Sequence, residues 1–249
     1  SEIAGEVFGT PTVVYDDGAA VGNTDQIQGD IPNLWKKYDA SLKGLVIGTS
    51  CKVIGDEAFS NSDLTGSLVI PDSVTKIGSL AFSSCSGLTG TLTIPNSVTS
   101  IGGGAFSYCF NLIGPLVIPD SVTIIGAGAF ATCGSLTGTL TIPNSVTVIN
   151  NNTFKGCSGL TGSLTIPDSV TSIGTAAFLF CTGFTGPLVI PNSVTSIGES
   201  AFRDCTGLTG SLTIPNSVTT IGVFAFEGCS ILTNVDYYVE KSVLDVASS

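Results

Sequence analysis

The chain of 249 residues has no histidine and no methionine, and it has a single tryptophan. The lack of histidine excludes Ser-His and Cys-His nucleophiles, because both need an imidazole as the base. Charged residues are also few, at 11% of the chain, whereas soluble domains average about 25%. Paired carboxylates for acid–base catalysis are correspondingly scarce. The sequence therefore predicts no catalytic residue, and we expect the protein not to be an enzyme.

Basic residues and long apolar runs are scarce as well. Lys and Arg number 8 against 19 Asp and Glu, which gives a formal net charge of −11. An acidic surface is repelled by phosphate backbones and by anionic lipid headgroups. No apolar run approaches the roughly 18 residues that a membrane span needs, and the N-terminus shows no signal-peptide pattern. We expect no nucleic-acid partner and no membrane insertion.

Repetition is the dominant feature of what remains. An Ile-Pro pair, a phenylalanine and a cysteine each recur at intervals of 24 residues, and one unit reads LTGTLTIPNSVTSIGGGAFSYCFN over residues 88–111. A fixed period of this length is the signature of a solenoid, in which stacked coils share one hydrophobic core. The recurring cysteines are Cys85, Cys109, Cys133, Cys157, Cys181, Cys205 and Cys229.

The first part of each unit predicts a β-strand. Leu92 and Ile94 lie two residues apart, so their side chains share the inward face, while Thr91 and Thr93 point outward. Pro95 lacks an N–H group and ends the strand.

The second part of each unit predicts a return across the core. Val98 and Ile101 have inward spacing, and Gly102 permits a bend that a Cβ would resist. We expect Phe106 to cover the core from a short helical or 3-10 turn, with Cys109 closing the coil.

These residues resemble the BspA-like leucine-rich repeat family, whose units read approximately L-x-x-I-x-I-P-x-x-V-x-x-I-G-x-x-A-F-x-x-C. The resemblance covers about residues 42–237 and implies a right-handed α/β-type repeat solenoid that is mostly β. Its expected form is one parallel sheet of about nine strands, with short 3-10 or helical turns on the opposite face. The expected strands lie around residues 45–47, 68–70, 92–94, 116–118, 140–142, 164–166, 188–190, 212–214 and 235–237.

One extra glycine per unit departs from the family pattern. It lengthens the 23-residue unit of the family to 24 residues, and an added residue at the strand entrance predicts a β-bulge that alters the twist. These glycines are Gly66, Gly90, Gly114, Gly138, Gly162, Gly186 and Gly210.

The units define three expected segments. Residues 1–41, with Trp35 and a short helix expected over 31–39, form an N-terminal cap. Residues 42–237 form the solenoid of 24-residue units, and residues 238–249 form a C-terminal cap or tail. Caps are expected because an uncovered solenoid exposes its core and its sheet edge.

The cysteine ladder has three alternative interpretations. Structural zinc needs four converging ligands, usually from C-x-x-C pairs, and the sequence has none. Disulfides between adjacent coils are geometrically conceivable, but seven thiols leave one over. A small, weakly polar cysteine also suits a tight inward position. We favour a structural ladder of free thiols, with no metal and no cofactor.

The outward face of the strands is the candidate ligand-binding surface. It is uncharged and mildly apolar, and it carries many hydroxyl groups. The alternative is that its β-branched residues are there only for strand propensity. The candidate residues are Thr91, Thr93, Val117, Thr139, Thr141, Ser163, Thr165, Val189, Ser211 and Thr213.

The family resemblance implies non-enzymatic recognition or adhesion. The expected partner is a protein or glycan on a cell, matrix or virion surface, and the expected location is extracellular or at the cell surface. One alternative is a virion tail-fibre or capsid-decoration protein, which near-identical repeats also suit. A second alternative is ice binding, because the Thr-x-Thr rows resemble the ice-binding surfaces of β-solenoid antifreeze proteins. Those rows are interrupted at Val117 and Val189.

Overall fold

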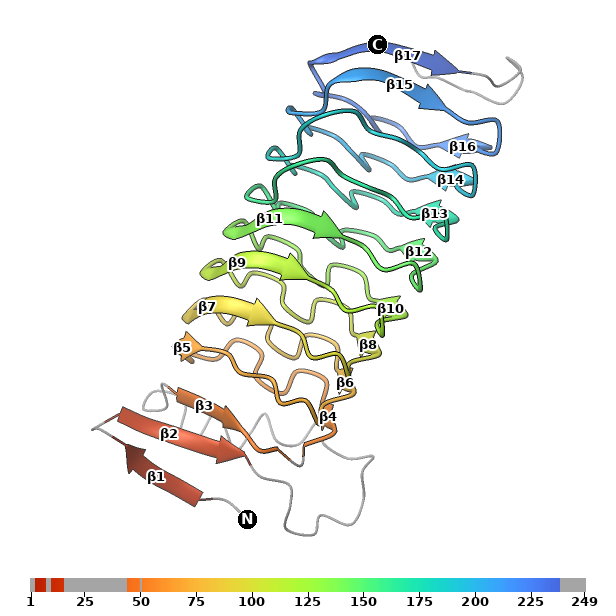
Figure 1. Ribbon diagram of the computed structural model, residues 1–249. Coiled ribbons are helices and arrows are strands. Elements are labelled where there is room, and N and C mark those ends of the chain that lie inside the picture. The colour runs from red at the N-terminus through yellow and green to blue at the C-terminus, as the bar shows by residue number, and fades with distance from the viewer. Residues whose placement is uncertain (1–2, 8–9, 16–43, 50, 238–249) are drawn as a thin grey trace.

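The computed structural model describes residues 3–7, 10–15, 44–49 and 51–237, which wind into a right-handed stack of coils (Figure 1). Each coil has three sides. In the coil of residues 88–111 these are the strand side (88–94), the short-strand side (98–101) and the turn side (103–110). The expected leucine-rich repeat solenoid is therefore confirmed.

The strand side consists of parallel strands joined from coil to coil. Strands β5, β7, β9 and β11 form one ladder, and β15 pairs with β17. Between β11 and β15 lie the two coils expected to hold strands at 164–166 and 188–190. These coils are joined by isolated bridges, such as Thr165 to Val189. Seven strands and a bridged gap thus stand in place of the expected nine strands, and the strand expected at 68–70 lies instead at Gly66–Ser67. The seven are β3 (Gly44–Ile47), β5 (Gly66–Ser67), β7 (Leu88–Thr93), β9 (Leu112–Val117), β11 (Leu136–Thr141), β15 (Gly210–Ile214) and β17 (Leu232–Tyr237).

The extra glycine of each unit forms the expected bulge. Gly90 has a φ of 80°, in the left-handed region that only glycine adopts easily. In the pairing of β7 with β9, Thr91 and Thr93 face Ile113 and Val117, so the extra residues lie in β9, where Gly114 (φ 81°) is the equivalent glycine. Because each bulge interrupts the ladder, the parallel pairing comes in short runs.

A second row of very short strands forms the short-strand side, and the sequence did not predict it. Each strand has two residues, and the row splits into two four-stranded ladders between β10 and β12. The strands are β4 (Val53–Ile54), β6 (Lys76–Ile77), β8 (Ser100–Ile101), β10 (Ile124–Ile125), β12 (Val148–Ile149), β13 (Ser172–Ile173), β14 (Ser196–Ile197) and β16 (Thr220–Ile221).

The split in this row has a local cause. After most of these strands a glycine N–H donates to the preceding coil, as from Gly126 to the Ile101 carbonyl at 2.8 Å. Asn150 occupies the equivalent place after β12, and its side-chain Nδ2 donates to the Ile125 carbonyl at 2.7 Å instead. A Cβ at Gly126 would collide with the backbone of Gly103. The glycine is therefore needed for close approach of the coils, rather than for the bend expected from the sequence.

The turn side is built from β-turns, and no helix forms among the described residues. The expected helical or 3-10 turns are absent there because two backbone positions per coil, such as Gly104 (φ 61°) and Tyr108 (φ 60°), are left-handed. Along the turn side, N–H groups donate alternately to a carbonyl of the same turn and to a carbonyl of the next coil. Ser107 donates to the Gly104 carbonyl at 3.0 Å, while Phe106 donates to the Ala129 carbonyl at 2.8 Å.

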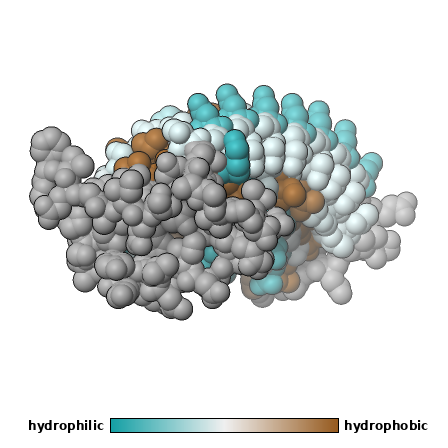
Figure 2. Space-filling view, turned by 90° about the horizontal axis from the view of Figure 1, so that it is seen from below, coloured by the Kyte–Doolittle hydropathy of each residue, from teal (hydrophilic) through white to brown (hydrophobic). Residues whose placement is uncertain are grey.

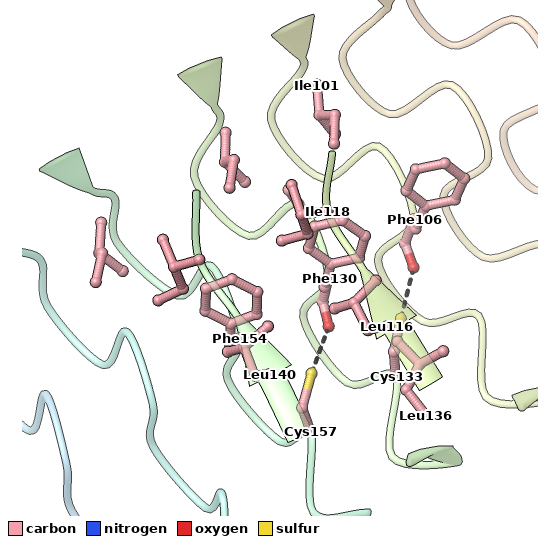
Figure 3. Close-up of a cluster of buried hydrophobic side chains, with 14 of the residues drawn as sticks. Ile101, Phe106, Leu116, Ile118, Phe130, Cys133, Leu136, Leu140, Phe154 and Cys157 are labelled. Carbon is pink, nitrogen blue, oxygen red and sulfur yellow. Dashed lines mark hydrogen bonds between the residues drawn. The ribbon is translucent and has the colours of Figure 1, made fainter. Parts of the chain in front are cut away.

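A continuous hydrophobic core fills the stack (Figure 3). Its centre is a column of parallel phenylalanine rings. The ring centroid of Phe130 lies 5.6 Å from that of Phe106 and 5.8 Å from that of Phe154. Leu116 and Ile118 pack beside the rings and are almost fully buried. Each coil thus buries its apolar edge against its neighbours, as stacked repeats must.

The N-terminal end of the strand side is covered. Strands β1 (Ile3–Val7) and β2 (Thr10–Tyr15) form an antiparallel hairpin, and β2 pairs in parallel with β3. This pairing satisfies the edge of β3, which would otherwise present open hydrogen-bonding groups. The helix expected over 31–39 and the tail at 238–249 lie outside the described residues, and the three-segment division stays a prediction.

Candidate binding surface

The strand side carries all ten residues predicted to contact a ligand, and the structure leaves each of them exposed. The exposure follows from strand alternation. In β7 and just beyond it, Leu92 and Ile94 are 2% and 5% exposed, while Thr91 and Thr93 face solvent. Burial of the inward side chains therefore fixes the direction of the outward ones.

The chemistry of this surface is neutral and mixed. Val69, Val117 and Val189 expose 69%, 61% and 68% of their surface. Two of these valines have a threonine as register partner in a neighbouring coil, at Thr93 and at Thr165. Valine and threonine side chains thus share one column without an ionised side chain. Such a surface suits a neutral partner that offers both apolar and hydrogen-bonding groups.

An edge of the stack carries a separate polar column. Seen from below, evenly spaced hydrophilic side chains follow one edge of the molecule (Figure 2), as the exposed Asn or Asp after each Ile-Pro pair predicts. No group of three or more metal-ligating side chains occurs among the described residues. These residues act as turn formers, since their side chains can bond nearby backbone.

The cysteines of the ladder lie in the core, each bonded to a phenylalanine carbonyl in the preceding coil. Cys133 Sγ donates to the Phe106 carbonyl at 2.9 Å, and Cys157 Sγ donates to that of Phe130 at 3.0 Å (Figure 3). Burial raises the pKa of the Cys157 thiol to about 12 and that of Cys229 to about 11. Because metal binding and redox chemistry need the thiolate, this arrangement gives the thiols a structural part.

The turn side holds exposed features that the sequence reasoning missed. Tyr108, Phe110, Phe180 and Phe224 are each about half exposed, at 45–51%. The sequence held a signal for them, because the residues around the recurring phenylalanine differ from unit to unit. The outward strand columns, in contrast, hold only Ser, Thr, Val and Pro from residue 67 to residue 213.

Three charged groups of the turn side interact near its C-terminal end. Arg203 Nε lies 2.9 Å from Glu227 Oε2 and 3.5 Å from Asp204 Oδ2. The same guanidinium lies over the Phe224 ring, 5.5 Å from its centroid. Since these pairs are partly exposed, solvent screens them, and the one guanidinium offsets only one of the two carboxylate charges.

Comparison with known proteins identifies related repeats. The family model described as "BspA type Leucine rich repeat region" matches residues 36–161 and 184–246, in six copies. A leucine-rich repeat protein from Bacteroides ovatus is 33% identical, with a TM-score of 0.61, over 79% of this chain and 55% of that one. A leucine rich cell surface protein from Faecalibacterium prausnitzii is 27% identical, with a TM-score of 0.48, over 84% and 58%. The T. pallidum leucine rich repeat protein is 29% identical, with a TM-score of 0.47, over 73% and 72%. No curated protein matches the chain.

These matches indicate a general role for the repeats and do not identify a ligand. The chain spans just over half the length of the first two solved structures. Repeats of this family generally serve as non-enzymatic binding scaffolds and are typically associated with surfaces. Among the described residues, no helix could cross a bilayer.

Proposed function

Because the chain belongs to the BspA-type leucine-rich repeat family, we propose that it is a non-enzymatic recognition and adhesion protein. It binds a protein or a glycan through the strand side, outside the cell or at a cell surface. The observation that carries this proposal is the neutral, exposed column of hydroxyl and methyl groups that the buried Leu and Ile side chains hold in place.

The rigidity of the strand side supports a binding role. Its outward side chains repeat once per coil, about 4.8 Å apart, on a backbone fixed by parallel pairing. Threonine and valine are also stiff at χ1, because both are branched at Cβ. A ligand that meets such a surface loses little affinity to the ordering of protein side chains.

The lack of activity is part of the proposal and rests on the chemistry of the side chains. The chain has no histidine, and burial raises the pKa of the six ladder thiols from Cys109 to Cys229, so neither an imidazole base nor one of these thiolates is available. The exposed hydroxyl groups therefore have no activating partner of the usual kind.

The proposed binding surface is tested by adding charge to its neutral side chains. Replacing Thr139 and Thr141 by lysine adds two charges to the strand side without touching the core, since both side chains are exposed. We expect loss of binding to an array of immobilised matrix proteins, with an unchanged melting temperature. The matched control is Thr147→Lys with Val148→Lys, which adds the same charge to the exposed short-strand side. Equal binding by both variants would rule out the strand side.

The ice-binding alternative has its own readout. Exposed valines interrupt the threonine columns at Val117 and Val189, and the strand ladder between β11 and β15 is reduced to bridges. Both features disturb the regular array that a crystal lattice would match. We expect no thermal hysteresis from the purified protein. Measurable hysteresis would favour ice binding over adhesion.

A further inference from the structure

A second exposed feature lies away from the strand side, on the turn side of the coil of residues 88–111. The rings of Tyr108 and Phe110 meet edge to face, with centroids 6.0 Å apart and an interplanar angle of 66°. Each ring is nearly half exposed, at 49% and 45%. Paired aromatic rings that remain in water are uncommon, because burying them is favourable.

The backbone at Tyr108 adds a second cost. Its φ is 60°, in the left-handed region that disfavours bulky side chains. The same position of other coils is occupied by Gly156 and Gly228, and by Asn61, which suit this conformation better. The fold therefore accepts a residue without a ring at this place. Phe180 shares this strain and exposure, so what sets Tyr108 apart is its pairing with a second exposed ring, and this pair points to a role in contact with a partner.

The surroundings of the pair define the partner's chemistry. No charged residue occurs in the turn-side segments of three successive coils, at residues 79–87, 103–112 and 127–136. The polar side chains of these segments that are exposed or half-exposed carry hydroxyls and an amide. Asn111, next to Phe110 in the chain, is held by a bond from its Nδ2 to the Ser86 carbonyl at 2.7 Å. These polar side chains include Ser84, Ser86, Asn111, Thr132 and Ser135.

We propose that Tyr108 and Phe110 form the stacking platform of a site for a neutral saccharide. An aromatic face packs against the C–H groups of a sugar ring, and hydroxyl and amide groups exchange hydrogen bonds with the sugar hydroxyls. A charged ligand would find no counter-ion in these three segments. The proposal extends the recognition role proposed above, but it uses a different side of the coil.

The test uses the intact protein and variants that the fold already tolerates. Tyr108→Gly and Phe110→Ser copy Gly156 and Ser86, which occupy the same repeat positions. Glycine also removes the left-handed strain, so we expect the double variant to melt no lower than the wild type. The matched control is Phe180→Gly, since Phe180 has the same repeat position, a φ of 62° and 49% exposure but shows no ring pairing among the described residues.

The probes are gels that contain β-glucan, xylan or galactomannan, with heparin as the anionic comparison. We expect at least one neutral gel to retard the wild type and the Phe180→Gly control, and added salt to leave the retardation unchanged. The double variant should bind on the order of tenfold more weakly. Unretarded wild type in all neutral gels, retardation by heparin alone, or equal retardation of the double variant would overturn the proposal.

The strand-side variants keep the two proposals distinct. Thr139→Lys with Thr141→Lys should leave saccharide retardation unchanged, because these residues lie on another side of the coil. If the Tyr108 and Phe110 variant instead loses only binding to an immobilised protein, the turn side is a protein-binding surface and the saccharide assignment is wrong.

Discussion

At the scale of single residues, the core owes its regularity to two side chains per coil. The phenylalanine rings stack along the axis, and each ladder thiol donates to the carbonyl of a phenylalanine in the preceding coil. The sequence predicted that both residue types point inward, because they recur at the period of the coil. It could not predict the thiol–carbonyl bond, because the two residues, such as Cys133 and Phe106, are 27 positions apart and meet only through stacking.

The phenylalanine column predicts a specific loss of stability. Phe130 is fully buried between two rings, so Phe130→Ala should lower the free energy of unfolding by about 3–5 kcal/mol. Denaturant unfolding measures this change. The exposed Phe110→Ser should change it far less, and similar losses for the two variants would contradict the proposed core.

The thiols predict a dependence on alkaline pH. Burial raises the pKa of Cys157 from 9.0 to about 12, so the folded state holds its proton more tightly than the unfolded state. The resulting stability is complete below pH 9 and is lost progressively between about pH 9 and pH 12. We expect the denaturation midpoint to fall across this window, and Cys157→Ala to reduce the slope. The same pH dependence of the midpoint in the wild type and in Cys157→Ala would contradict this contribution of the Cys157 thiol.

At the scale of elements, the strand side and its bulges were predictable. On the short-strand side the inward Val98 and Ile101 were predictable as well, but the short strands and the turns of the other two sides were not. Alternation of inward Leu and Ile with outward Thr predicts strands directly, and the added glycine predicts the bulge. Two-residue strands such as β8 are too short to leave a periodic signal. The Ala-Phe segment suggests a helix locally, but its alternate N–H groups bond to the next coil. That choice depends on stacking, which local propensity does not contain.

The short-strand side predicts which glycines are indispensable. A Cβ at Gly126 would collide with the preceding coil, so Gly126→Ala should lower the free energy of unfolding by about 1–3 kcal/mol. Asn150→Gly should be far less costly, because a backbone N–H can replace the bond from Nδ2 to the Ile125 carbonyl. Urea unfolding of both variants measures the difference. A tolerated alanine at Gly126 would mean that the coils are less closely packed than described.

At the scale of the whole molecule, the coils share one core and present surfaces of different character. The strand side is uniform and neutral, whereas the turn side changes from coil to coil and carries the exposed aromatic residues. The sequence predicted the stack and the outward columns from the 24-residue period alone. The sequence did not predict the exposed rings. Their positions in the unit are occupied by many residue types, and their exposure depends on left-handed turns.

The most direct measurement of the central claim uses the unreactive core thiols as background. A single Thr141→Cys introduces an accessible thiol on the strand side, where a bulky maleimide can be attached selectively. Labelling should abolish binding to the array of matrix proteins, while the same label at Thr147→Cys, on the short-strand side, leaves binding intact. Full binding by the protein labelled at position 141 would contradict recognition through the strand side.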